Sequence, residues 1–181
     1  MKKILLISLV MLFACKHQAV VPQEEHPMPV QVSSKQFDQL KTLAGTWEGA
    51  HRTAKGNEPA KVEYQITSGG SAIVEKLFPG TPHEMVSIYT PTKTQNGSTV
   101  LMTHYCMQGN QPRLELTKAD TKSMHFSFVE GTNITSDKDM HMHALKITFK
   151  DQNNFTQEWT SFKDGKAMKP EVFTYSRIGN N

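Results

Sequence analysis

Apolar and polar residues alternate along most of this chain, and a two-residue period is typical of half-buried antiparallel β-strands. The alternation is clear at residues 62–66, 124–128, 145–149 and 155–159. Glycine, proline, asparagine and aspartate interrupt it at short intervals, which predicts turns. The stretches between these turns predict about ten short strands and no helix long enough for a parallel crossover.

One short helix is expected before these strands. Ser33 or Ser34 can cap it, and Gly45 ends it. Three apolar residues recur inside it at helical spacing: Phe37, Leu40 and Leu43. A closed barrel is the simplest way to protect the edges of so many strands. The pattern therefore predicts an all-β fold, an antiparallel up-and-down β-barrel with a short N-terminal helix.

The first residues carry a different pattern, that of an export signal. Lys2 and Lys3 precede an apolar run over residues 4–13, which is too short to span a bilayer. The run ends in Leu-Phe-Ala-Cys at residues 12–15, which resembles the lipobox of bacterial lipoproteins. The resemblance implies that residues 1–14 are removed as a signal peptide and that Cys15 is acylated.

Residues 15–32 are expected to form a lipid-anchored flexible tether, because three prolines stand there among polar residues without apolar periodicity. Such a segment reaches on the order of 50 Å when extended, so the barrel domain over residues 33–181 can stand away from the membrane. Directly after the cysteine, an aspartate would resemble an inner-membrane retention signal, but this chain has Lys16 there. In a cell with two membranes, the analogy implies an outer-membrane lipoprotein facing the periplasm.

The charge balance argues against nucleic acid as a partner. The formal charge of +3 includes Lys2 and Lys3, and without them the 20 basic side chains become 18, against 17 acidic ones. No cluster of lysine and arginine follows the signal, and nucleic-acid binding needs one. With Cys15 joined to lipid, Cys106 is the single free thiol of the mature chain. The sequence indicates neither an oligomeric state nor a particular cofactor.

A family resemblance begins directly after the expected helix. Residues 43–47, Leu-Ala-Gly-Thr-Trp, resemble the first-strand Gly-x-Trp signature of the calycins, the group of lipocalins and fatty-acid-binding proteins. In those barrels an arginine near the end of the chain lies across that tryptophan. The resemblance implies a lipocalin-like barrel whose base is closed by Arg177 lying across Trp47, and a guanidinium on an indole face is a favourable contact.

The middle of the chain carries a second likeness. Residues 79–85 (Pro-Gly-Thr-Pro-His-Glu-Met), 104–106 (His-Tyr-Cys) and 109–113 (Gly-Asn-Gln-Pro-Arg) resemble a group of functionally uncharacterised bacterial lipocalin-like proteins. The likeness covers roughly residues 43–177. It implies the fold but no reaction.

His104 and Cys106 are the first candidate site. The two-residue period puts them on one face of a strand together with Val100 and Met102. Imidazole and thiolate bind soft metals, and a histidine can activate a thiol, so the pair could form a metal or nucleophile site. The alternative is a buried cysteine beside a hydrogen-bonded histidine at the barrel rim, since free cysteine is commonly an inert core residue.

His141 and His143 are the second candidate. Extending the alternation of residues 145–149 backwards puts both imidazoles on the inward face, at the mouth of the barrel. Paired histidines at strand spacing can chelate Zn, Cu or Ni, and one could bind haem iron as in the haem-binding members of the calycin group. A composite site with His104 is a further option. The alternative is a solvated strand start after a polar loop.

Asn110, Gln111 and Arg113 are the third candidate. Two amides and a guanidinium could receive a carboxylate or a phosphate, for which arginine offers a bidentate fork. They could equally bind the backbone of their own loop, since Gly109 followed by asparagine is favourable turn chemistry. Glu75 could pair with Arg113 in the barrel interior.

Three classes of function are consistent with these residues. In the favoured class, an envelope lipoprotein holds a small, largely apolar molecule in its barrel, and His104, Gln111 or Arg113 fixes its polar end. In the second class, Cys106 and the histidines form an enzyme or redox sensor with a metal or haem. The third class is a surface interaction module whose barrel is filled by side chains. No triad order, nucleophile elbow, phosphate loop or carboxylate pair supports the enzyme class.

Overall fold

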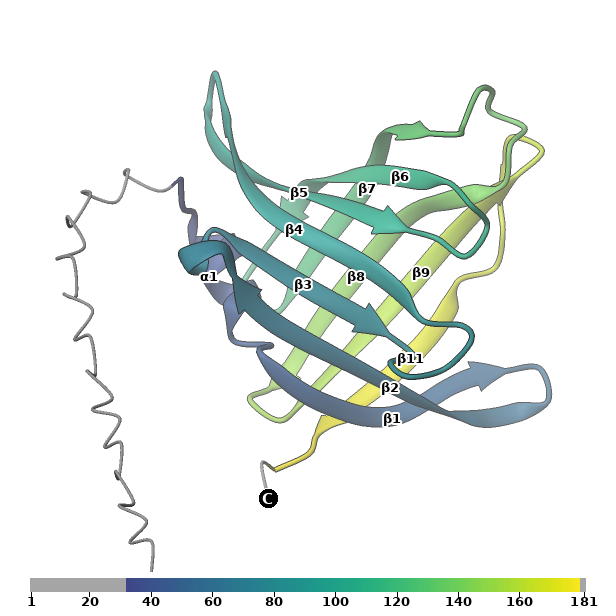
Figure 1. Ribbon diagram of the computed structural model, residues 1–181, viewed down its shortest axis with the longest axis horizontal. Coiled ribbons are helices and arrows are strands. Elements are labelled where there is room, and N and C mark those ends of the chain that lie inside the picture. The colour runs from purple at the N-terminus through teal and green to yellow at the C-terminus, as the bar shows by residue number, and fades with distance from the viewer. Residues whose placement is uncertain (1–31, 180–181) are drawn as a thin grey trace, which may run out of the picture. The chain divides into compact units, whose positions relative to one another are not determined.

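The structure is a computed structural model that describes residues 32–179. Over these residues the chain forms a closed antiparallel β-barrel of ten strands with one short α-helix at its start (Figure 1). The predicted fold class is confirmed, and the barrel is compatible with a lipocalin-like fold. The predicted signal peptide, the lipidated Cys15 and the tether up to residue 31 lie outside the described residues.

The elements follow the predicted pattern. Ser34 caps α1 as its hydroxyl accepts a hydrogen bond from the N–H of Phe37, and the helix buries Phe37 and Leu40. The elements are α1 (Lys35–Lys41), β1 (Gly45–Thr53), β2 (Gly56–Thr67), the 3-10 turn η1 (Ser68–Gly70), β3 (Ala72–Leu77), β4 (Met85–Thr94), β5 (Gly97–Tyr105), β6 (Gln111–Ala119), β7 (Ser123–Thr132), β8 (His141–Asp151), β9 (Asn154–Lys163), β10 (Lys166–Ala167) and β11 (Glu171–Arg177).

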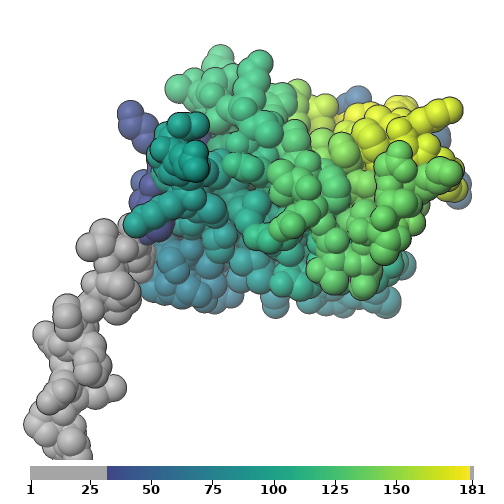
Figure 2. Space-filling view, turned by 90° about the horizontal axis from the view of Figure 1, so that it is seen from above, coloured from purple at the N-terminus to yellow at the C-terminus, as the bar shows by residue number. Residues whose placement is uncertain are grey.

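Strand order in the barrel follows chain order. Each strand from β1 to β9 pairs with the next one, and β11 lies between β9 and β1, which closes the sheet. The short strand β10 adds only two pairs at the end of β9. Figure 2 shows the outer surface of the barrel from above, where green segments from the second half of the chain lie beside yellow C-terminal ones. Closure removes the exposed edges that a ten-strand sheet would otherwise have.

The closing pair, β1 and β11, needs a glycine at one position where the backbone of β11 leaves no room for a side chain. A Cβ atom added to Gly49 would lie only 1.8 Å from the carbonyl oxygen of Thr174. Any side chain at this position would therefore push the two strands apart. The glycine of the Gly-x-Trp segment, Gly45, has a φ of +126° and packs against the Arg177 guanidinium, so it too has a specific backbone role.

Arg177 and Trp47 hold the end of the barrel at which the chain enters and leaves. The guanidinium lies 4.0 Å from the indole centroid, and it donates hydrogen bonds of 2.7 Å to the carbonyl oxygens of Ala44 and Thr42. The indole Nε1 donates at 2.7 Å to the carbonyl oxygen of Leu43. These bonds tie the first and last strands to the end of α1.

Large apolar side chains fill most of the barrel interior. Trp47 and Phe155 meet edge to face at 4.7 Å between ring centroids, and Tyr89 and Phe126 do so at 5.8 Å. Burying one large apolar side chain contributes roughly 1.5–3 kcal/mol to the free energy of unfolding. The largest fully buried side chains include Trp47, Tyr89, Phe126, Phe155, Met102, Leu114, Met124 and Leu145.

We expect Arg177→Met to lower the free energy of unfolding by about 2 kcal/mol, because three charge-assisted bonds to backbone carbonyls are lost. Urea unfolding would measure this. The matched control is Arg113→Met, which removes an exposed ion pair with Glu130 and should cost less than about 1 kcal/mol. Equal losses in the two variants would contradict the role assigned to Arg177.

Candidate functional site

A row of polar side chains crosses the barrel interior. Tyr64 on β2 is the direct cross-strand partner of Glu75 on β3, which pairs with Ser87 on β4, which pairs with His104 on β5. All four side chains are buried. Because directly paired residues point to the same face of a sheet, the register brings four polar groups from four strands into one line.

Glu75 lies at the centre of this polar row. Tyr64 Oη donates to its Oε1 at 2.6 Å, Tyr89 Oη donates to its Oε2 at 2.8 Å, and Gln157 Nε2 also donates to Oε1. Burial raises the pKa of the Glu75 carboxyl above its usual value, although the hydrogen bonds from Tyr64, Gln157 and Tyr89 act in the opposite direction. The carboxyl group is therefore fully desolvated but surrounded by donors.

His104 ends the row. Its Nδ1 lies 3.0 Å from the Ser87 hydroxyl oxygen, and its ring packs against Trp159 at 4.9 Å between centroids. Its Nε2 is buried and has no hydrogen-bond partner within the described residues. Burial lowers the pKa of His104 to about 4, so the imidazole is neutral at neutral pH.

An apolar cavity of about 60 Å³ lies against His104. It reaches the rim of the barrel, where Glu171 accepts a hydrogen bond of 2.5 Å from His51. A cavity of this size holds a water molecule or a small apolar group, but a larger ligand needs its walls to move. Its lining consists of His104, Leu77, Phe78, Met85, Met142, Trp159, Glu171 and Phe173.

Cys106 is not part of this cavity lining among the described residues. It starts the tight β5–β6 turn, where its N–H donates to the carbonyl oxygen of Asn110 and its own carbonyl accepts from Gly109. Burial raises the pKa of the Cys106 thiol, although the N–H groups of Gln108 and Met107 lower it in part. A raised pKa reduces the thiolate fraction and therefore the nucleophilicity.

The third candidate group does not face the interior cavity. Asn110 Nδ2 donates at 2.8 Å to the carbonyl oxygen of Met140, and Gln111 Nε2 donates at 3.4 Å to that of Gly109. Both amides thus hold the β5–β6 turn and its neighbouring loop. Arg113 lies on the outer surface.

The expected pairing of Glu75 with Arg113 is wrong. Arg113 forms an exposed ion pair with Glu130, its cross-strand partner on β7, whereas Glu75 bonds to two tyrosines and Gln157. The physical reason is strand parity. Arg113 is next to the buried Leu114, so it points to the opposite side of the barrel wall.

The expected inward orientation of His141 and His143 is also wrong. A β-bulge between Met142 and Ala144 adds a residue to β8 and reverses the alternation that precedes it. Met142 therefore lines the interior cavity together with His104. The two histidines line a separate cleft of about 510 Å³, which we call the histidine cleft, so the composite site with His104 does not form.

The two imidazoles of the histidine cleft are bonded to each other. His141 Nδ1 lies 2.7 Å from the carbonyl oxygen of Asp139, which only accepts, and His141 Nε2 lies 3.0 Å from His143 Nδ1. The ring of His143 stacks on Phe162 at 3.6 Å. Both nitrogens of His141 are thus engaged, and over residues 32–179 no group of three or more metal-ligating side chains is present.

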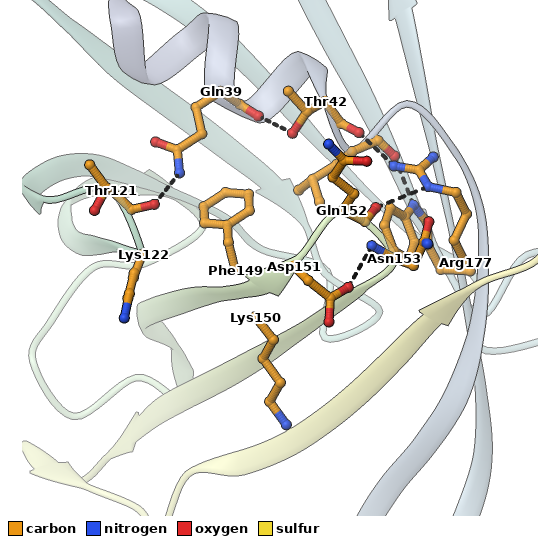
Figure 3. Close-up of a pocket in the computed structure, with 12 residues that line it drawn as sticks. Gln39, Thr42, Thr121, Lys122, Phe149, Lys150, Asp151, Gln152, Asn153 and Arg177 are labelled. Carbon is orange, nitrogen blue, oxygen red and sulfur yellow. Dashed lines mark hydrogen bonds between the residues drawn. The ribbon is translucent and has the colours of Figure 1, made fainter.

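A third cleft, of about 600 Å³, lies beside α1 (Figure 3). The ring of Phe149 stands among its polar side chains. Gln39 Nε2 donates to the carbonyl oxygen of Thr121, and Arg177 Nε donates to that of Gln152. These polar groups are bonded to the protein's own backbone, whereas His104 Nε2 in the interior is not.

No protein-family model matches this sequence, and neither does any curated protein. The case for a site therefore rests on the geometry. Sequence reasoning identified His104 but missed Ser87, Tyr89 and Gln157 as its supporting groups. The signal for Ser87 was its place between the apolar residues of β4, but its partners follow only from the register. The barrel offers a site that could bind a small ligand, at the interior cavity beside His104.

Stability should fall at acidic pH because of His104. In the unfolded chain a histidine titrates near 6.5, whereas His104 in the folded state titrates at about 4. Between these values the unfolded state binds a proton that the folded state excludes. The free energy of unfolding is therefore highest above about pH 6.5, and it falls by roughly 3 kcal/mol as the pH decreases to 4. Urea unfolding at pH 7 and pH 4 should show a smaller decline for His104→Gln.

The control for this prediction is His83→Gln, at an exposed turn position. It should keep the pH dependence of the wild type. An unchanged pH dependence in His104→Gln would mean that the buried imidazole is not excluded from protonation.

Proposed function

We propose that this protein is an envelope lipoprotein whose barrel binds a small, largely apolar molecule with a polar end on His104. One observation carries the proposal: His104, whose buried Nε2 has no hydrogen-bond partner among the described residues, lines an apolar cavity. Leaving such a nitrogen unpaired costs about 1–3 kcal/mol, and a ligand that supplies the missing partner recovers this free energy. The apolar walls favour a hydrocarbon body behind that polar end.

The side chains that line the cavity can rearrange to admit a ligand larger than the cavity itself. Common ligand pockets measure about 300–1,000 Å³, well above the 60 Å³ found beside His104. Two of the wall residues, Met85 and Met142, have unbranched side chains with three rotatable bonds. Methionine adapts to irregular shapes, so both side chains can move aside when a ligand enters from the rim.

The location is proposed on the sequence alone. Acylated Cys15 anchors the chain in a membrane, and residues 15–32 connect that anchor to the barrel. By analogy with sorted lipoproteins, the membrane is the outer membrane and the barrel faces the periplasm. A single function then unites both parts, since a tethered binding protein captures small molecules within the envelope.

Native mass spectrometry tests the binding function. The full chain is expressed in a bacterial envelope, extracted in detergent and measured without refolding. We expect a mass excess of one small organic molecule, its loss in His104→Leu and its retention in Cys106→Ser, because the thiol lies outside the cavity lining. An unadorned wild-type mass, together with no binding of added apolar compounds, would refute the proposal and favour the interaction module.

Membrane anchoring is tested by Cys15→Ala. We expect the wild type to sediment with membranes and to carry the mass of a lipid on its N-terminal peptide. The variant should lack both properties, since no acyl acceptor remains at the lipobox. Recovery of unlipidated wild-type protein in the soluble periplasm would contradict the anchor.

A further inference from the structure

We propose that the histidine cleft binds a protonated primary amine, whose ammonium group bonds to Asp137 and His143 and whose apolar body packs against the aromatic side chains of the cleft. The cleft measures about 510 Å³, which falls within the range of about 300–1,000 Å³ that is common for ligand pockets. Its lining comes from β7, β8, β9, the loop before β8 and the turn after β9. The site is separate from the interior cavity, and the inference does not depend on a ligand there.

Three aromatic rings from neighbouring strands give the cleft its apolar surface. His143 on β8 stacks on Phe162 of β9 at 3.6 Å between ring centroids, and on Phe128 of β7 at 5.4 Å. All three side chains are half-buried, so part of each ring remains open to contact. The π-system of an aromatic ring attracts cations. These rings therefore favour a ligand that combines an apolar body with a positive charge.

The ionised side chains of the lining are carboxylates. Glu130 and Asp137 line the cleft, whereas no lysine or arginine within residues 32–179 does so. Glu130 forms an ion pair with Arg113, but the Asp137 carboxylate has neither a hydrogen bond nor an ion pair with any described residue. Its Oδ2 lies 3.5 Å from where a Cβ atom of Gly165 would stand, at the turn after β9. An unpaired carboxylate in this position attracts a cation and repels an anion.

The bond between the two imidazoles leaves an acceptor for the ammonium group. The carbonyl oxygen of Asp139 only accepts, so His141 Nδ1 carries a proton. A neutral imidazole has one proton, so Nε2 of the buried His141 accepts from His143 Nδ1–H. Nε2 of His143 then holds a lone pair, and no described residue bonds to it. Burial and the neighbouring His141 lower the pKa of His143, which keeps this ring neutral at neutral pH.

These groups together distinguish an amine from other ligands. A primary ammonium group has three N–H donors and a full charge, and the cleft supplies two acceptors, one of them anionic. An alcohol has a single donor and no charge, so it gains less from the same acceptors. A carboxylic acid is ionised at neutral pH, and its charge would oppose that of Asp137. The ligand class is therefore a primary amine with an apolar body.

Phenethylamine and phenethyl alcohol share a carbon skeleton and differ in their polar group, so they serve as the two probes. Each is titrated into the full-length protein in non-ionic detergent at neutral pH and physiological ionic strength, and ¹H–¹⁵N correlation spectra are recorded. We expect the amine to bind about tenfold more tightly than the alcohol. The largest shifts should fall on the amides of Gly131 and Gly165, which line the cleft. Equal affinities, or largest shifts elsewhere, would overturn the inference.

Asp137→Asn removes the charge and keeps the size of the side chain, so we expect it to weaken amine binding about tenfold and to leave alcohol binding unchanged. The matched control is Asp164→Asn, the same change at an exposed turn residue outside the lining. Asparagine tolerates its φ of +53°, and salt screens a charge that is exposed to solvent. The control should therefore weaken amine binding less than about threefold. Equal losses in both variants would overturn the site.

A further variant separates this inference from the proposed function. His104→Leu changes the interior cavity and leaves the histidine cleft intact, so it should bind phenethylamine as tightly as the wild type does. Loss of amine binding in His104→Leu would place the amine in the interior cavity and overturn the inference. Retained amine binding in a protein that carries no ligand in its barrel would uphold the inference while the proposed function fails.

Discussion

A carboxyl group inside a closed β-barrel has to find hydrogen-bond partners for both of its oxygens, and Glu75 imposes this requirement on the centre of the molecule. Tyr64, Tyr89 and Gln157 meet it from three different strands. Each of these side chains can reach Glu75 only if the strands keep their present register. The hydrogen bonds of one buried group therefore fix the relative positions of strands that are far apart in the sequence.

The sequence predicted those features that depend on a single strand. The alternation of apolar and polar residues predicted the barrel. It also predicted that Glu75 and His104 point inward, because each stands two residues from a buried apolar neighbour. The short helix followed from its cap and its spacing of apolar residues. The contact of Arg177 with Trp47 was implied by the calycin resemblance, and the structure places the two residues together.

Features that depend on pairing between strands were not predictable. No residue pattern in the sequence indicates the bulge after Met142. The bulge nevertheless directs His141 and His143 towards a separate cleft. The partners of Glu75 are Tyr64, Tyr89 and Gln157, which lie far apart in the sequence. Only the strand register shows that their side chains meet. A change of parity by one residue thus moved His141 and His143 to another site, whereas the groups that support His104 were missed because their contacts depend on the strand register.

The polar row makes the interior cavity the best candidate site, although wider clefts lie on the outside. Apolar residues of similar volume could fill a barrel with no loss of stability, so stability alone does not explain a buried ionisable row. In the histidine cleft His141 bonds to His143 and to the backbone of Asp139. In the interior the row ends at His104 Nε2, which has no partner among the described residues. A ligand with a polar end and an apolar body could bond to this nitrogen and fill the apolar cavity that His104 lines.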